Sequence, residues 1–335
     1  PFPGSLYSRI SPMRVFPSNL DKNGFILLEK PLPGGVDRLT RNDPTFSDLA
    51  GVLTGAKPAT YTDCLPESLP ALRDLCAALK LKLLLPEEAG RRGAHFAGDG
   101  RKVMVLIGKR MKDLRTAEAA WRRSTVEMDW GLALGYPECC VKAFTRWFAN
   151  GGGAGPRPEL VRFTAAATAP GGPLDFRLNN AWNYFSRLDY KDPSDRRGHE
   201  RLLALNPDID IPSLHVASWH PCSYRCRASA KKAGLIYSFI ERHSPAYAAG
   251  LRDLLARPLL FRDKYELAAL RGTFRRGTLA CRGAAGPVSL LGAGTRRLLS
   301  YCGELRRGPG GLVFERDGKT LFAPPPDEFL LLDFR

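Results

Sequence analysis

Four of the eight cysteines in this 335-residue chain fall into two tight groups, and these residues are the best suited to chemistry. Cys139 and Cys140 are adjacent, and Cys222 and Cys226 are four positions apart. The other cysteines are scattered, at Cys64, Cys76, Cys281 and Cys302. Cysteine thiolates bind zinc and iron–sulfur clusters, so the grouping predicts a metal or redox site formed by the four grouped residues.

A proline stands one or two residues before each group, at Pro137 and Pro221. Proline suits the first position of a helix because its missing N–H would have no partner within the helix. We therefore expect each group in or near a first helical turn, where unpaired N–H groups and the helix dipole stabilise a thiolate. The spacing places Cys222 and Cys226 on one helix face and turns Cys139 about 100° from Cys140. Two such helix starts, facing each other, would present four sulfurs to one centre.

Three kinds of site compete for these cysteines. A [4Fe–4S] cluster takes cysteine ligands and is wide enough for adjacent cysteines to reach. A zinc site with four thiolates usually shows two C-x2–4-C knuckles, and an adjacent pair chelates one tetrahedral ion poorly. Dithiol–disulfide chemistry would favour C-x-x-C, which neither group shows, and four buried core thiols form the non-functional alternative. We expect the [4Fe–4S] cluster, with zinc as the alternative.

The two segments resemble the motifs of an uncharacterised prokaryotic family of unknown function. The first motif, G-Y-P-x-C-C-V-x-x-F, matches residues 135–144, and the second, H-P-C-S-x-x-C, matches residues 220–226. The resemblance covers about the middle third of the chain. It implies that the cysteine site is functional, and it implies no particular reaction.

Two polar residues lie beside the cysteines in the sequence. His220 precedes the second proline and is a candidate ligand or proton donor, with a hydrogen-bonded structural role as the alternative. Glu138 precedes the first pair and is a candidate general acid, although a carboxylate at a helix N-terminus is stabilising in any case. We take His220 and Glu138 as the candidate catalytic residues.

The chain is strongly basic, with 50 Lys and Arg against 34 Asp and Glu, a formal net charge of +16. Such a surplus attracts polyanions, although the predominance of Arg over Lys also fits a simple compositional bias. Residues 91–123 are the most basic stretch, and we expect them to form one face for RNA, DNA or a phosphorylated substrate. The sequence contains no Walker A, H-E-x-x-H or radical-SAM pattern, so the reaction class stays open.

The hydrophobic patterns predict an α+β or mixed α/β fold in three segments, with one integrated domain as the alternative. Residues 1–60 form an irregular N-terminal arm with a strand-like run at 24–28. Residues 61–150 form an α/β segment that ends in the Cys-Cys helix. Residues 171–335 form an α+β segment with the Pro-Cys helix and a C-terminal β-hairpin.

Several elements within these segments are predicted from local signals. Cys76 lies on the apolar stripe of a helix that begins near Ser68, which indicates a core position. A helix over 111–134 should end at Gly135. The other expected elements are a hairpin at 93–107, helices from 137 to 150, from 221 to 243 and around 266–270, and strands at 214–216, 312–314, 321–322 and 329–334.

The sequence has no run of 18 apolar residues and no pattern of a secretory signal peptide. Clustered cysteines in a long chain favour a reducing compartment, so we expect a cytoplasmic protein. Two functions follow as hypotheses. One is an iron–sulfur enzyme that acts on a small or nucleotide-containing substrate, and the other is a zinc-stabilised nucleic-acid-binding protein without catalysis.

Overall fold

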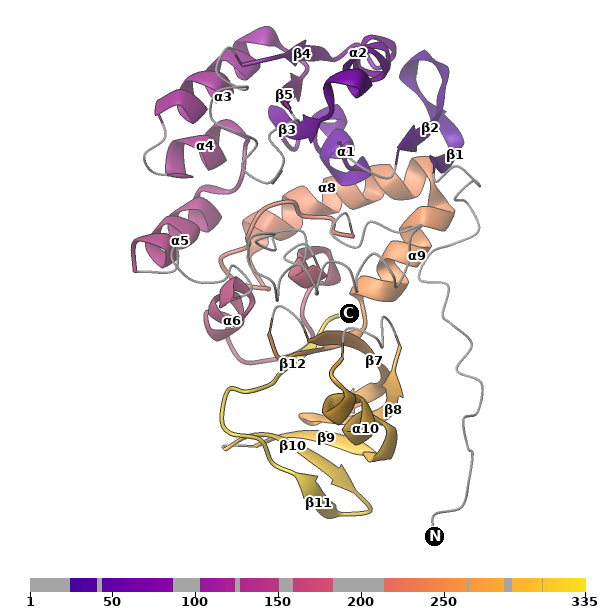
Figure 1. Cartoon of the computed structure of the whole chain (residues 1–335), viewed down its shortest axis with the longest axis vertical. Helices are drawn as coiled ribbons and strands as arrows, with labels where there is room; N and C mark the ends of the chain where they lie inside the picture. The colour runs from indigo at the N-terminus through magenta and orange to yellow at the C-terminus, as the bar shows by residue number, and fades with distance from the viewer. Residues whose placement is uncertain are drawn as a thin grey trace.

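A computed structural model describes residues 25–40, 44–86, 103–123, 127–150, 159–182, 214–263, 266–285, 291–308 and 310–335. Helices and antiparallel sheets are both present, so the predicted α+β class is confirmed. Figure 1 shows the N-terminal elements at one end, the C-terminal sheet at the other, and the long helix α8 between them.

The N-terminal part contains a two-stranded hairpin, a three-stranded sheet and four helices. Its elements are β1 (Phe25–Leu32), β2 (Val36–Thr40), α1 (Phe46–Thr54), β3 (Ala59–Cys64), α2 (Leu69–Ala78), β4 (Lys82–Leu84), β5 (Val103–Gly108), α3 (Met111–Arg123) and α4 (Glu127–Ala133). The central strand of the sheet is β5, which pairs antiparallel with β3 and β4. Among the described residues 25–40 and 44–60, the expected irregular arm is instead formed by β1, β2, α1 and the start of β3, and apolar residues such as Ile26, Phe46 and Leu49 enter the main core.

The middle of the chain is helical and carries the cysteines. It contains α5 (Glu138–Ala149), α6 (Glu159–Ala166), α8 (Arg227–His243) and α9 (Pro245–Leu255). Helix α8 packs against α1, β1 and α9, so it joins the N-terminal elements to the rest of the molecule. Its buried residues, Ala233, Ile236, Tyr237 and Ile240, recur at helical spacing.

The C-terminal part is a seven-stranded antiparallel sheet with the order β11-β10-β9-β8-β7-β6-β12. Its elements are β6 (Pro258–Phe261), β7 (Leu267–Arg275), β8 (Thr278–Ala284), α10 (Ala293–Tyr301), β9 (Glu304–Gly308), β10 (Gly311–Arg316), β11 (Lys319–Phe322) and β12 (Leu330–Asp333). The predicted C-terminal hairpin is confirmed. Asp317 and Gly318 form its turn with φ of 51° and 74°, as a two-residue hairpin turn with positive φ requires.

The structure corrects several predicted elements. Residues 267–270 belong to strand β7 and not to a helix, because pairing with both β6 and β8 outweighs the helical preference of the Leu and Ala side chains. Residues 214–216 form no strand, although His215 is buried. The helix predicted over 111–134 is divided into α3 and α4. The second arm of the predicted 93–107 hairpin is β5, and residues 93–102 lie outside the described residues.

A buried ion pair links α1 to the start of β3. The Lys57 side chain is 1% exposed, and its Nζ donates to Asp48 Oδ1 at 2.5 Å, to Thr60 Oγ1 at 3.0 Å and to Ser218 Oγ at 3.1 Å. Burial by itself raises the pKa of Asp48, but the charges of Lys57 and His215, together with hydrogen bonds to Lys57 and Ser218, outweigh it and lower this pKa from 3.8 to about 2. The carboxylate is therefore ionised in the folded protein at every pH above about 2.

This lowered pKa makes folding stability depend on acid pH. The contribution of the Asp48 carboxylate is fully present above the unfolded pKa of 3.8 and is lost as the pH falls through about 2. We expect the free energy of unfolding to lose about 2 kcal/mol more in the native protein than in Asp48→Asn between pH 5 and pH 2, because one pKa unit corresponds to about 1.4 kcal/mol. Urea denaturation at both pH values measures the difference, and equal losses in the two proteins would contradict it.

Candidate metal centre

The first cysteine pair lies in the first turn of α5, as predicted. Gly135 ends the preceding helix with a φ of +79°, and a Cβ at this position would lie 2.2 Å from Pro58 Cδ, so only glycine fits. Pro137 then begins α5, and its carbonyl accepts the Cys140 N–H at 2.8 Å. Cys140 is buried at this helix start, whereas Cys139 is exposed.

The second cysteine pair lies on a loop and not along a helix. Helix α8 begins at Arg227, so Cys226 is its N-cap and its Sγ accepts the Ser229 N–H at 3.5 Å. The Cys226 N–H donates to the Ser223 carbonyl at 3.1 Å, which closes a turn that brings Cys222 back towards Cys226. The prediction that these two cysteines share one helix face is therefore wrong, because a turn and not a helical repeat places them together.

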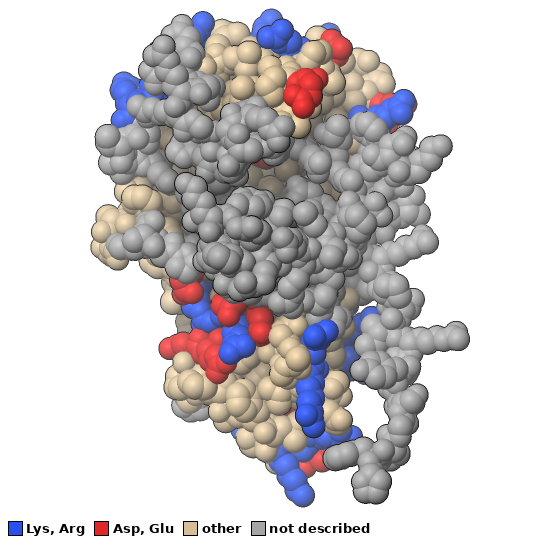
Figure 2. Space-filling model, in the orientation of Figure 1, with Lys and Arg blue, Asp and Glu red and all other residues tan. Residues whose placement is uncertain are grey.

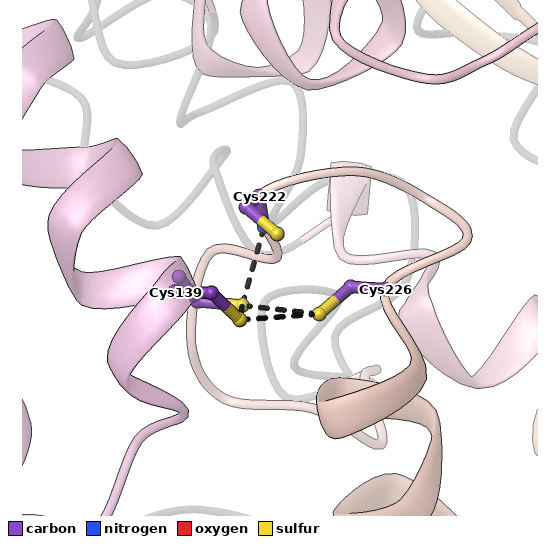
Figure 3. A group of neighbouring side chains, drawn as sticks. Cys139, Cys222 and Cys226 are labelled. Atoms are coloured by element: carbon purple, nitrogen blue, oxygen red, sulfur yellow. Dashed lines mark hydrogen bonds between the residues drawn. The ribbon is translucent and has the colours of Figure 1, made fainter.

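The four sulfurs meet where α5 faces this loop (Figure 3). Cys226 Sγ lies 3.6 Å from Cys139 Sγ and 3.7 Å from Cys140 Sγ, and the latter two are 3.9 Å apart. With Cys222 included, all four Sγ atoms lie within 4.8 Å of one another. The predicted convergence of the four cysteines on one centre is confirmed, and the group can hold a metal ion.

Hydrogen bonds to the sulfurs come from the backbone and from a buried serine. The Cys222 N–H donates to Cys140 Sγ at 3.3 Å. Ser229 Oγ lies 3.0 Å from the same sulfur, and the Trp219 indole N–H donates to this oxygen at 2.9 Å. Such outer contacts orient ligands and stabilise thiolate charge. Ser229 and Trp219 were not identified from the sequence as residues of the site. Their positions, three residues after Cys226 and three before Cys222, were the only local indication of this role.

The thiols affect one another's protonation strongly. A hydrogen bond from Cys140 lowers the pKa of Cys226 to about 4 despite its burial. The same hydrogen bond, followed by burial, raises the pKa of Cys140, whereas burial is the main cause that raises the pKa of Cys222 to about 12. One thiolate is therefore stabilised by its neighbouring thiols, and additional negative charge at such short range requires a cation.

The two candidate catalytic residues lie beside this centre without joining it. Glu138 is exposed, and its carboxylate pairs with Lys142 Nζ at 2.6 Å. The hydrogen bond and charge of Lys142 lower the pKa of Glu138, which favours the carboxylate over the protonated form that a general acid needs. The His220 ring stacks on Phe144 with centroids 5.0 Å apart. Among the described residues, the metal-ligand group comprises the four cysteines alone, and the catalytic roles of Glu138 and His220 stay predictions.

The other cysteines lie away from the centre. Cys76 is 2% exposed in the core, as predicted, and burial raises its pKa to about 11. Cys281 in β8 and Cys302 at the end of α10 are buried in one apolar cluster, where a hydrogen bond from Cys302 lowers the pKa of Cys281. Their separation in the sequence carried no signal of this contact.

The predicted basic face is described only from residue 103 onward. In α3, Arg110 pairs with Asp113, and both Arg115 and Arg122 pair with Glu118. Figure 2 shows blue and red side chains interspersed on the described parts of one face of the molecule. This part of the 91–123 stretch is therefore partly neutralised, and binding of a polyanion there stays a prediction. Among the described residues, none of the helices has the length and apolar character needed to cross a membrane.

Comparisons of the chain with protein-family models, curated protein sequences and solved structures find no match. The resemblance to the family with G-Y-P-x-C-C and H-P-C-S motifs therefore stays a prediction.

Proposed function

We propose that the four cysteines bind a single zinc ion that stabilises the fold. The observation that carries this proposal is the spacing of the sulfurs. Four ligands at the usual Zn–S distance of about 2.3 Å occupy the corners of a tetrahedron with edges of about 3.8 Å. The three Sγ pairs among Cys139, Cys140 and Cys226 are 3.6, 3.7 and 3.9 Å apart, so they match these edges.

The same spacing supports zinc over the [4Fe–4S] cluster that the adjacent cysteines favoured. In such a cluster each cysteine binds a different iron, and the sulfide-bridged core holds the four Sγ atoms well apart. All four Sγ atoms here lie within 4.8 Å of one another, so a cluster would require the loop before α8 to move away from α5. A single ion requires little rearrangement.

A site with four thiolate ligands has no open coordination position, which is typical of structural zinc. The ligands come from segments 82 to 87 residues apart, so the ion would tie the start of α5 to the start of α8. Because α8 packs against both α1 and α9, this link would stabilise the central helix of the molecule. The proposal corresponds to the zinc-stabilised alternative, without a catalytic role for the metal.

Metal analysis tests the proposal directly. We expect one zinc per chain, no acid-labile sulfide and no visible absorption in protein purified without oxygen. Replacement by Co²⁺ should produce the visible bands of a tetrahedral tetrathiolate site, a control that reports geometry and not only stoichiometry. A brown protein with about four irons and four sulfides per chain would instead establish the cluster.

A further inference from the structure

A cavity of about 910 Å³ opens between the cysteine-bearing part and the C-terminal sheet. Its walls come from α6, the following loop over 168–174, the β7–β8 turn, β12 and the C-terminal residue. Tyr224 and Arg225, which lie between two of the cysteine ligands, complete the wall. This volume falls within the range of about 300–1,000 Å³ that is typical of small-molecule sites.

Five arginines line the cavity against two aspartates, so its lining is cationic. They are Arg162, Arg225, Arg276, Arg307 and Arg335, with Asp327 and Asp333. Two of the arginines form ion pairs within the protein, and the first of them, Arg162, pairs with Glu159 at 3.6 Å. Arg162 donates to the backbone carbonyls of Asp327, Arg262 and Glu328, and Arg335 pairs with Asp333 at 3.0 Å.

The other three, Arg225, Arg276 and Arg307, form no ion pair with any residue that the structure describes. Arg307 lies over the Phe274 ring, with its guanidinium carbon 5.2 Å from the ring centroid. Arg276 is exposed on the β7–β8 turn. Arg307 also donates to the Leu331 carbonyl and lies within reach of the Asp333 charge. The five arginines still outnumber the two aspartates of the lining, so the space keeps a net positive charge.

Arg225 is positioned closely by the loop that faces it. One of its Nη atoms donates to the Gly172 carbonyl, and its Nε is buried with no hydrogen-bond partner in the described structure. A Cβ on Gly171 would lie 2.5 Å from the other Nη, and the φ of this glycine is +146°. The glycine loop therefore makes the space that the guanidinium occupies.

We propose that this cavity binds a phosphorylated small molecule. Planar guanidinium groups match phosphate oxygens with paired, charge-assisted hydrogen bonds. The excess of arginines over aspartates in the lining suits a ligand with more than one negative charge. Apolar lining from Phe274, Leu330 and Leu332 can contact the organic part of such a ligand. The inference goes beyond the structural zinc and does not depend on it, because the arginines come mainly from α6 and the C-terminal sheet.

The positive charge of Arg276 can be removed without disrupting the β7–β8 turn. Its φ is +48°, and asparagine favours this left-handed conformation, so Arg276→Asn should fold at least as stably as the native protein. Arg275→Asn on the same hairpin is the matched control, because Arg275 is exposed and does not line the cavity. Arg225→Gln probes the wall nearest the cysteines, with metal content measured to show that the centre is intact.

Calorimetric titration with inorganic pyrophosphate and with ATP, adenosine being the uncharged comparison, tests the proposal. We expect both phosphates to bind the native protein and adenosine not to bind. Arg276→Asn and Arg225→Gln should weaken binding by about tenfold or more, the effect of one lost charge-assisted hydrogen bond, and Arg275→Asn should change it less than twofold. Absence of binding by both phosphates, or equal weakening in Arg275→Asn and Arg276→Asn, would overturn the proposal. So would binding of a single-stranded RNA that pyrophosphate does not displace.

Discussion

Replacement of Cys226 by serine should remove stoichiometric metal from the protein, and Cys140→Ser and Cys222→Ser should do the same. A serine hydroxyl stays protonated at neutral pH and is a poor ligand for zinc, so loss of one thiolate leaves an incomplete tetrahedron. Cys226 lies within 3.7 Å of two other sulfurs and is the N-cap of α8, so its variant should show the largest loss. Metal content after dialysis against a weak chelator measures the effect.

The four residues should also fail as a unit. A double variant of Cys222 and Cys226 should lose little more metal than either single variant, because residues that act together are not additive. Cys76→Ser is the matched control, since this buried thiol lies outside the sulfur group. It should lower the free energy of unfolding by about 1–3 kcal/mol, the cost of a poorly paired hydroxyl in the core, and keep full metal content. Full metal content in the double variant would contradict a shared centre.

Lys57→Met should destabilise the protein more than most single substitutions. It removes the ion-pair partner of the Asp48 carboxylate and the hydrogen-bond donor to Thr60 and Ser218. The Asp48 side chain is only 14% exposed, so water cannot replace these contacts fully. Loss of one member of a buried ion pair costs about 3–5 kcal/mol because the other charge is left without compensation. Equilibrium denaturation by urea measures the change in the free energy of unfolding.

Two control variants distinguish the cost of leaving a buried charge unpaired from the effect of simply losing a lysine. Lys142→Met breaks an ion pair in which both side chains are at least 60% exposed, and it should cost less than about 1 kcal/mol. Combining Lys57→Met with Asp48→Leu should recover much of the lost stability, because two apolar side chains can replace a buried pair. A loss in Lys57→Met no larger than that in Lys142→Met would contradict the expectation.

Local features of the sequence determined the elements that begin and end at recognisable residues. The Gly135 stop, the Pro137 start of α5 and the Asp317-Gly318 turn were all predictable, because each depends on the backbone conformation that its own residue types permit. The choice of the four ligands was predictable for the same reason, since thiol groups near helix starts have a chemistry of their own.

The tertiary structure decided what local patterns do not encode. Residues 267–270 became a strand because two neighbouring strands were available to pair with them, and the second cysteine pair converged through a turn closed by Ser223. The spacing of sulfurs from α5 and from the loop before α8, on which the choice between one ion and a cluster depends, is set by packing across 82 to 87 residues.

The buried Lys57 and the arginine-lined cavity belong to the same class of features. Nothing beside Lys57 in the sequence marks it for burial, and the cavity arginines that form no ion pair with a described residue are separated by up to 82 positions, between Arg225 and Arg307. The sequence gives only the sign of a side chain's charge. The partners of that charge and its exposure to solvent depend on which distant segments pack around it in the folded protein. The sequence by itself therefore determined which four cysteines can hold a metal, and only the fold decided their spacing and placed the cationic cavity beside them.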